Sequence, residues 1–173
     1  ASEKSLQENI EVTARVVELA KPYGANVEAE LGYVAKLHQD PSKGGFTQAV
    51  EAKIFVDSTG VNALAVAIGS AHGFYKETPS LQIDLLKEIN QQLDIPLVLH
   101  GSSGIPDHQI REAIKNGLAK INIATEVKDT FMRNLKHQLA QNNDIDLRNV
   151  FPSAIQAVAK LLEHKLKLVS MNH

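Results

Sequence analysis

The sequence has 173 residues, of which 43% are hydrophobic, so its length fits one domain, or a large part of one, with a core of ordinary size. A formal net charge of −2 argues against a nucleic-acid partner, and no apolar run approaches the roughly 20 residues of a membrane span. The absence of cysteine excludes disulfides, restricts any metal site to His, Asp or Glu, and suits the cytoplasmic location that we predict.

Short apolar segments alternate with helix-like segments along the chain. An amphipathic helix is expected over residues 2–21, ahead of the first apolar segment. Four segments have the pattern of buried strands, namely NVEAELG (26–32), ALAVAIG (63–69), PLVLHG (96–101) and KINIAT (120–125). Successive strands begin about 30 residues apart, as in βαβ units. We therefore predict an α/β fold with a parallel sheet, as a single domain over residues 1–173.

Helices are expected between and after these strands, over residues 80–93, 105–117, 126–141 and 152–168. In the second of these helices, Asp107 is a candidate N-cap and Gly117 lies where a glycine commonly ends a helix. Residues 33–47 contain a proline and two glycines and are too long for a simple connection. We interpret them as a mobile loop that could act as a lid.

Polar residues are found at the carboxyl end of each predicted strand. In parallel α/β folds the strand-to-helix loops converge at that end, where functional sites are built. Four separate segments therefore indicate one site, with the residues Glu28, Glu30, His72, His100, Asn122 and Thr125.

His72 and His100 follow neighbouring predicted strands, and a glycine follows each of them. A single histidine at a strand end is more often a hydrogen-bonded structural residue than a metal ligand. Two of them could share a divalent metal through their imidazole nitrogens, with Glu30 as a nearby carboxylate. The pair therefore favours a metal site.

The segments HGSSG and NIAT suggest an anion site. The Gly/Ser loop presents backbone N–H groups and hydroxyls, and NIAT ends at the start of a helix, so together they could hold a phosphate. The alternative is a tight turn followed by Thr125 as an ordinary N-cap. Lys76 could add a cation to the site, or it could be a solvated surface lysine.

The blocks VEAELG, LAVAIGSAHGFYK, PLVLHGSSGIP and KINIATE, in this order and spacing, resemble the class II zinc-dependent ketose-bisphosphate aldolases. This family contains fructose- and tagatose-bisphosphate aldolases, and the resemblance covers nearly the whole chain. It implies a (β/α)8 TIM barrel, of which this chain would supply about the last four βα units and the carboxyl-terminal helices. It also implies reversible cleavage of a ketose (bis)phosphate to dihydroxyacetone phosphate and an aldehyde.

The resemblance also implies roles for individual residues. His72 and His100 match zinc ligands, and Glu30 matches a catalytic-site carboxylate that contacts the metal in some members. Zn2+, or another divalent ion, would act as a Lewis acid that stabilises the enediolate of dihydroxyacetone phosphate. A monovalent cation, Na+ or K+, could bind near Gly73 and Ser103. The sugar-phosphate-binding positions are Gly73, Lys76, Gly101, Ser102, Ser103, Asn122, Ile123, Ala124 and Thr125.

The first difference from the family concerns the barrel strands that come before the strand predicted at residue 26. The family carries its first zinc histidine and its catalytic aspartate at the end of the third barrel strand, and no such strand exists here. Because a barrel of roughly 250 residues has eight strands, we expect a carboxyl-terminal half that needs its amino-terminal half and is inactive alone. Family habit implies a homodimer or a homotetramer.

A second departure lies in the loop at residues 33–47. Family members carry a glycine pair and a proton-transferring glutamate about eight positions after the match to Glu30, whereas position 38 is His here and the glycine pair is absent there. Either His38 or Asp40 substitutes for that glutamate, or a different aldehyde is used, or the activity is altered. The alternatives to an aldolase are a non-catalytic relative that binds a sugar phosphate and an α/β phosphate-binding protein without metal.

Overall fold

The structure is a computed structural model that describes residues 1–32, 45–73, 75, 78–141 and 143–170. The chain divides into two compact units, residues 1–122 and residues 123–173. The single domain over residues 1–173 stays a prediction. Within the described ranges, no helix is both long and apolar enough to cross a membrane.

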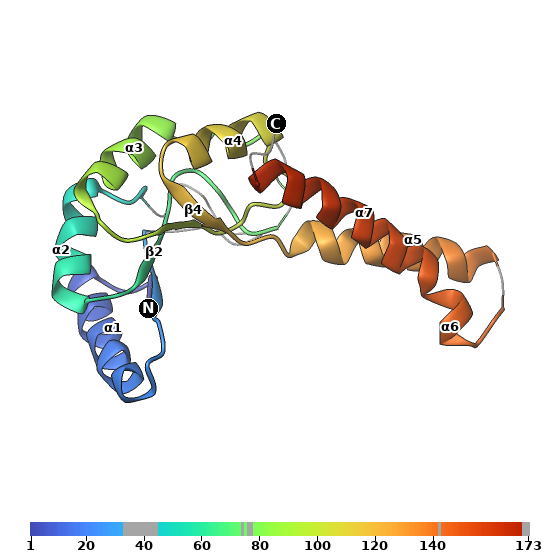
Figure 1. Cartoon of the computed structure of the whole chain (residues 1–173), viewed down its shortest axis with the longest axis horizontal. Helices are drawn as coiled ribbons and strands as arrows, with labels where there is room; N and C mark the ends of the chain where they lie inside the picture. Colours follow the sequence, from blue (N-terminus) through green and yellow to red (C-terminus); the bar gives the residue numbers. More distant parts are fainter. Residues whose placement is uncertain (33–44, 74, 76–77, 142, 171–173) are drawn as a thin grey trace. The chain divides into compact units, whose positions relative to one another are not determined.

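The first unit contains the predicted parallel sheet. Among the described residues its strands are arranged in chain order, β1 (Glu28–Leu31), β2 (Ala63–Val66), β3 (Leu97–Leu99) and β4 (Leu118–Ile121), and every neighbouring pair is parallel. The helices of this unit are α1 (Leu6–Ala20), the 3-10 turn η1 (Lys21–Tyr23), α2 (Ala49–Thr59), α3 (Ile83–Gln92) and α4 (Asp107–Lys115). Helices α1 to α4 pack beside one another in chain order and cover one face of the sheet (Figure 1).

Several element boundaries differ from the predictions. Helix α1 starts at Leu6 rather than at residue 2 because Ser5 and Glu8 form a capping box in which each accepts a backbone N–H of the other. Strand β3 ends at Leu99 because Gly101 adopts a φ of 69° and turns the chain, so His100 directly follows the strand. The prediction of Asp107 as an N-cap was wrong. Pro106 holds that position, and Asp107 is the first helical residue.

Strand β4 begins at Leu118, two residues earlier than predicted, and ends before Asn122. The left-handed φ of 103° at Gly117 lets the chain pass from the end of α4 directly into the strand. Asn122 still lies next to the end of β3, because its backbone N–H donates to the Leu99 carbonyl at 3.0 Å.

The two faces of the sheet differ in chemistry. Residues that alternate along a strand point to opposite faces, and the register pairs Glu30 with Ala65, Ala65 with Val98, and Val98 with Lys120. One face therefore carries the acidic side chains of β1. The other face carries buried leucines and valines. Together with the fully buried Phe55, Leu86 and Ile89 of helices α2 and α3, they belong to the core.

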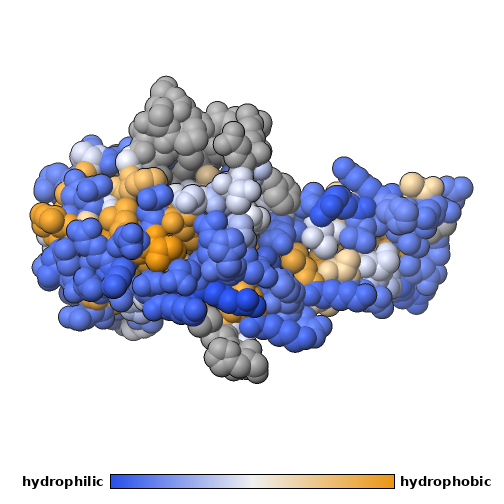
Figure 2. Space-filling view, turned by 90° about the horizontal axis from the view of Figure 1, so that it is seen from above, coloured by the Kyte–Doolittle hydropathy of each residue, from blue (hydrophilic) through white to orange (hydrophobic). Residues whose placement is uncertain are grey.

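The face of the molecule drawn in Figure 2 is mainly polar. Figure 2 shows hydrophilic residues over most of the visible face, with apolar residues gathered in smaller patches between them. Some apolar side chains of the helices are exposed, among them Val12, Val16 and Leu19 of α1.

Thr47 joins the carboxyl ends of β1 and β2. Its buried hydroxyl donates to the Leu31 carbonyl at 2.6 Å and accepts from the Ala67 N–H at 2.8 Å. The Thr47→Val variant would leave both backbone groups without these partners. We expect its free energy of unfolding to fall by about 1–3 kcal/mol, the cost of an unsatisfied buried group, in denaturant titration.

Thr59 provides the matched control for this prediction. It is buried too, but its hydroxyl only donates to the Phe55 carbonyl within α2, at 2.7 Å. The Thr59→Val variant should therefore lose much less stability. An equal loss in the two variants would contradict the bridging role of Thr47.

The second unit is helical, as predicted. It contains α5 (Thr125–Gln141), α6 (Leu147–Val150) and α7 (Pro152–Val169), and α5 packs along α7. Pro152 is at the first turn of α7, where its missing N–H costs nothing. Lys165 of α7 is only 9% exposed and pairs with Glu126 of α5 at 3.2 Å. This ion pair fixes the first turn of α5 against α7.

Candidate metal site

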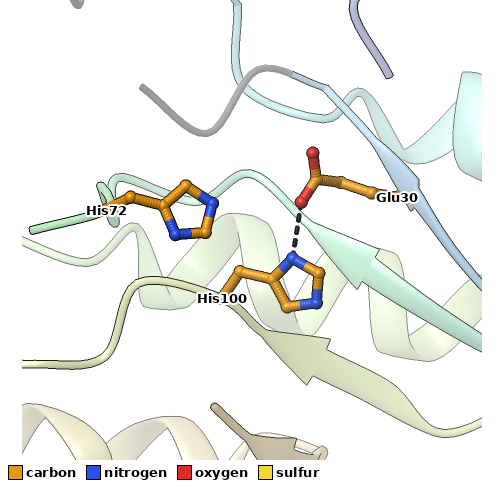
Figure 3. A group of neighbouring side chains, drawn as sticks. All are labelled: Glu30, His72 and His100. Carbon is orange, nitrogen blue, oxygen red and sulfur yellow. Dashed lines mark hydrogen bonds and ion pairs between the residues drawn. The ribbon is translucent and has the colours of Figure 1, made fainter. Parts of the chain in front are cut away.

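Glu30, His72 and His100 come together at the carboxyl ends of three adjacent strands. Glu30 lies in β1, His72 follows β2 and His100 follows β3. Their potential ligand atoms all lie within 4.8 Å of one another (Figure 3). His100 Nδ1 is 2.5 Å from Glu30 Oε2, and the two imidazole centroids are 6.1 Å apart. The residues predicted from the sequence to share a metal are thus neighbours in space.

The backbone around Gly101 brings the two histidine-bearing loops close together. A Cβ atom at position 101 would lie 2.6 Å from the Ala71 carbonyl carbon and 3.1 Å from the His72 nitrogen. Only glycine fits such an approach at a left-handed φ of 69°. The glycine after each histidine was a sequence signal, and at position 101 the structure gives it this physical reason.

Tyr75 joins the same two loops by hydrogen bonds. Its hydroxyl accepts from the Ala71 N–H at 2.8 Å and donates to the Gly101 carbonyl at 2.7 Å. Burial raises the pKa of Tyr75, and the bond from Ala71 offsets this only in part, so the phenol keeps the proton that it donates. Tyr75 carries no signal in the sequence, because no motif marks a tyrosine that bonds to backbone groups of two loops.

Glu30 is held by contacts from the amino-terminal segment. The Ser2 hydroxyl donates to Glu30 Oε1 at 2.6 Å, and Asn9 of α1 donates from its side chain to the Glu30 carbonyl at 3.0 Å. A cavity of about 340 Å³ lies next to Glu30 and His100 and is bordered by α1 residues such as Val12 and Thr13. These contacts fix the strand position and one carboxylate oxygen of Glu30, while the other oxygen faces His100.

Glu28 also contacts His100, from the position two residues before Glu30. Its Oε1 is 3.1 Å from His100 Nε2, and its Oε2 accepts from Lys120 of β4 at 2.7 Å. Burial raises the pKa of Glu28, but the hydrogen bonds and charges of Lys120 and His100 lower it by more, so the net pKa lies below its ordinary value. The sequence placed Glu28 at the site but did not indicate a partner for it.

Hydrogen bonds link some of the predicted phosphate-binding residues within the described part of the chain. Ser102 donates its N–H to the Asn122 carbonyl at 3.3 Å, which places the loops after β3 and β4 side by side. Ser102 and Ser103 are buried, and the Ser102 hydroxyl donates to the Leu99 carbonyl. Gly73 directly follows His72 and has a left-handed φ of 100°.

The other predicted residues belong to the second unit or lie outside the described residues. Ile123, Ala124 and Thr125 belong to the second unit, and Thr125 is the first residue of α5. His38, Asp40 and Lys76 lie outside the described residues. Phosphate binding therefore stays a prediction.

The donor set of the cluster fits a divalent metal such as zinc. Zinc in proteins takes imidazole nitrogen and carboxylate oxygen as ligands, and catalytic zinc sites commonly use three protein groups. Two imidazoles and one carboxylate meet here, drawn from different strands. The short contact between His100 Nδ1 and Glu30 further shows that both groups point toward the same space.

Comparisons with known proteins match nearly all of the chain. A family profile described as class II fructose-bisphosphate aldolase matches residues 1–173. The D-tagatose-1,6-bisphosphate aldolase subunit GatY of Klebsiella oxytoca is 38% identical over 169 residues, which are 95% of this chain and 60% of that protein. The chain thus spans less than two thirds of the length of this curated relative.

Solved structures match as well. The YdjI aldolase of Escherichia coli K12 is 38% identical with a TM-score of 0.83, covering 98% of this chain and 58% of that chain. The solved structure of a putative fructose-1,6-bisphosphate aldolase from Coccidioides immitis is 25% identical to this chain and superposes with a TM-score of 0.87. The match covers 98% of this chain and 60% of that chain. The expected fold class, a TIM barrel of which this chain forms a part, is thereby confirmed.

Proposed function

Since this chain belongs to the class II fructose-bisphosphate aldolase family, we propose that it forms one part of the active site of a metal-dependent aldolase. The reaction is the reversible cleavage of a ketose (bis)phosphate to dihydroxyacetone phosphate and an aldehyde. The observation that carries the proposal is the cluster of Glu30, His72 and His100 at the carboxyl ends of three parallel strands. The name of the Klebsiella relative supports a ketose bisphosphate, such as the tagatose or the fructose compound, as substrate.

The residues of this chain would bind a metal ion and the substrate phosphate. His72 and His100, with Glu30 as a further ligand, would hold Zn2+ or another divalent ion, and a bound ion supplies Lewis-acid polarisation of the substrate oxygens. The loop at 101–103, with Gly73 and Asn122, would bind the phosphate and hold the reacting carbon in place. Na+ or K+ near Gly73 and Ser103 would add charge compensation for that phosphate.

The complete protein would need more than this chain. From what the family resemblance implies, we propose that an amino-terminal half supplies the remaining barrel strands, a third histidine and the catalytic aspartate, and that this chain alone is inactive. His38 or Asp40 is the candidate for proton transfer to the aldehyde part. We further propose a homodimer or homotetramer in the cytoplasm.

Hydrogen exchange tests this function. The complete protein, loaded with zinc, should exchange one prochiral hydrogen of dihydroxyacetone phosphate with deuterium from the solvent, because the reaction in the synthetic direction begins by removing that hydrogen. NMR would follow the loss of the hydrogen signal. Absence of exchange at saturating zinc would overturn the aldolase proposal. If dihydroxyacetone phosphate still binds, a non-catalytic sugar-phosphate-binding role would take its place.

A further inference from the structure

We propose that Glu28, held by Lys120, is a positioning residue that orients the His100 imidazole for metal binding. This inference rests on the metal site of the proposed function and extends it to two residues that the family resemblance did not assign. Glu28 Oε1 lies 3.1 Å from His100 Nε2, and Lys120 Nζ lies 2.7 Å from Glu28 Oε2. The three side chains form a chain from β4 through β1 to the end of β3.

Small residues on the intervening strand make this arrangement possible. Glu28 and Glu30 pair in register with Ala63 and Ala65 of β2, so all four side chains lie on the same face. A methyl group is the entire side chain of each alanine. The two glutamates can therefore extend across β2 to His100, which follows β3, and Glu28 also reaches Lys120 on β4.

The two nitrogens of His100 have different partners. Nδ1 faces Glu30, which is itself a candidate ligand, and Nε2 faces Glu28, which lies outside the ligand cluster. A neutral imidazole carries a single N–H. With that hydrogen on Nε2 and donated to Glu28, Nδ1 keeps the lone pair that a metal requires. Glu28 thus selects the tautomer that can bind a metal beside Glu30.

Lys120 keeps Glu28 in place for this role. A carboxylate on a half-exposed strand could rotate toward solvent, and the side chain of Glu28 is 29% exposed. The ammonium group of Lys120 binds the oxygen that does not face the histidine.

Zinc affinity of the complete protein tests the proposal through competition with a chelator. Removal of an outer carboxylate from a metal-bound histidine costs about 10–100-fold in metal affinity, so we expect this loss for Glu28→Ala. The Glu28→Gln variant keeps an acceptor oxygen and should recover part of the affinity. Lys120→Met should weaken binding less than Glu28→Ala does and should add little to it in the double variant, because it acts through Glu28.

A long-range 1H–15N NMR spectrum of the zinc-loaded protein provides a second measurement. In the wild type we expect a slowly exchanging hydrogen on His100 Nε2, and in Glu28→Ala that hydrogen should exchange rapidly with water. The control is Glu163→Gln, which removes the same charge from an exposed pair with Lys167 on α7. Unchanged zinc affinity and an unchanged Nε2–H signal in Glu28→Ala would overturn the proposal.

The outcomes separate this inference from the proposed reaction. Zinc binding that depends on Glu28, without hydrogen exchange of dihydroxyacetone phosphate, would overturn only the reaction. Normal exchange together with zinc affinity independent of Glu28 would overturn only the positioning role. A wild-type protein that binds no zinc would overturn both.

Discussion

Alanine in place of Gly101 is expected to damage the metal site although position 101 contributes no side chain. The new Cβ would collide with the carbonyl of Ala71, so the segment that carries His72 must move away from His100. A displacement of about 1 Å can reduce a catalysed rate about a hundredfold. We expect the Gly101→Ala variant of the complete protein to show this loss in the hydrogen-exchange assay, together with weaker zinc binding.

A variant at Gly60 is the control that separates the steric clash of a new Cβ from the cost of a left-handed backbone conformation. It has nearly the same φ, 67° against 69°, but a Cβ atom there would meet no atom within 4 Å. The Gly60→Ala variant should therefore show only the cost of a left-handed alanine, about 1–3 kcal/mol in the free energy of unfolding. Its zinc affinity should be normal. Equal zinc affinity in the two variants would refute the view that Gly101 sets the distance between the histidine loops.

Loss of either histidine is expected to have the second large effect. His72→Ala and His100→Ala each remove one of the candidate ligands that meet within 4.8 Å. Since even an outer partner of a ligand is worth about 10–100-fold in metal affinity, each variant should lose more than this. Metal analysis after equilibrium dialysis would measure the loss, and activity should fall with metal content.

His108 is the matched control for the two histidines. It is an exposed histidine of α4, away from the ligand cluster, and His108→Ala should keep full zinc content. Zinc content that does not change in His72→Ala would favour the phosphate-binding protein without metal instead. Circular dichroism would show that each variant is folded.

The order of the strands and of most helices was predictable because it depends on local patterns, although α2 and α6 were not among the expected helices. Apolar runs of four to seven residues and apolar stripes at helical spacing gave the parallel sheet and the helices over residues 80–93, 126–141 and 152–168 within a few residues. Boundaries were less accurate, since they depend on single groups such as the Ser5 capping box or the turn at Gly101.

The meeting of Glu30, His72 and His100 also followed from the sequence. Parallel strands end at the same edge of a sheet, so residues at their carboxyl ends become neighbours whatever the details of packing. The tandem motifs AHG and LHGSSG indicated the class II aldolase family, and the family comparison confirms that the chain belongs to it.

Only the tertiary structure decided which side chains support the cluster. Glu28 and Lys120 are 92 residues apart, and their ion pair depends on how the sheet brings β1 and β4 together on one face. Tyr75 joins two loops through backbone atoms, which carry no sequence signature. Periodicity therefore determined the elements and the edge at which the site forms, whereas contacts between distant segments determined which side chains surround His100.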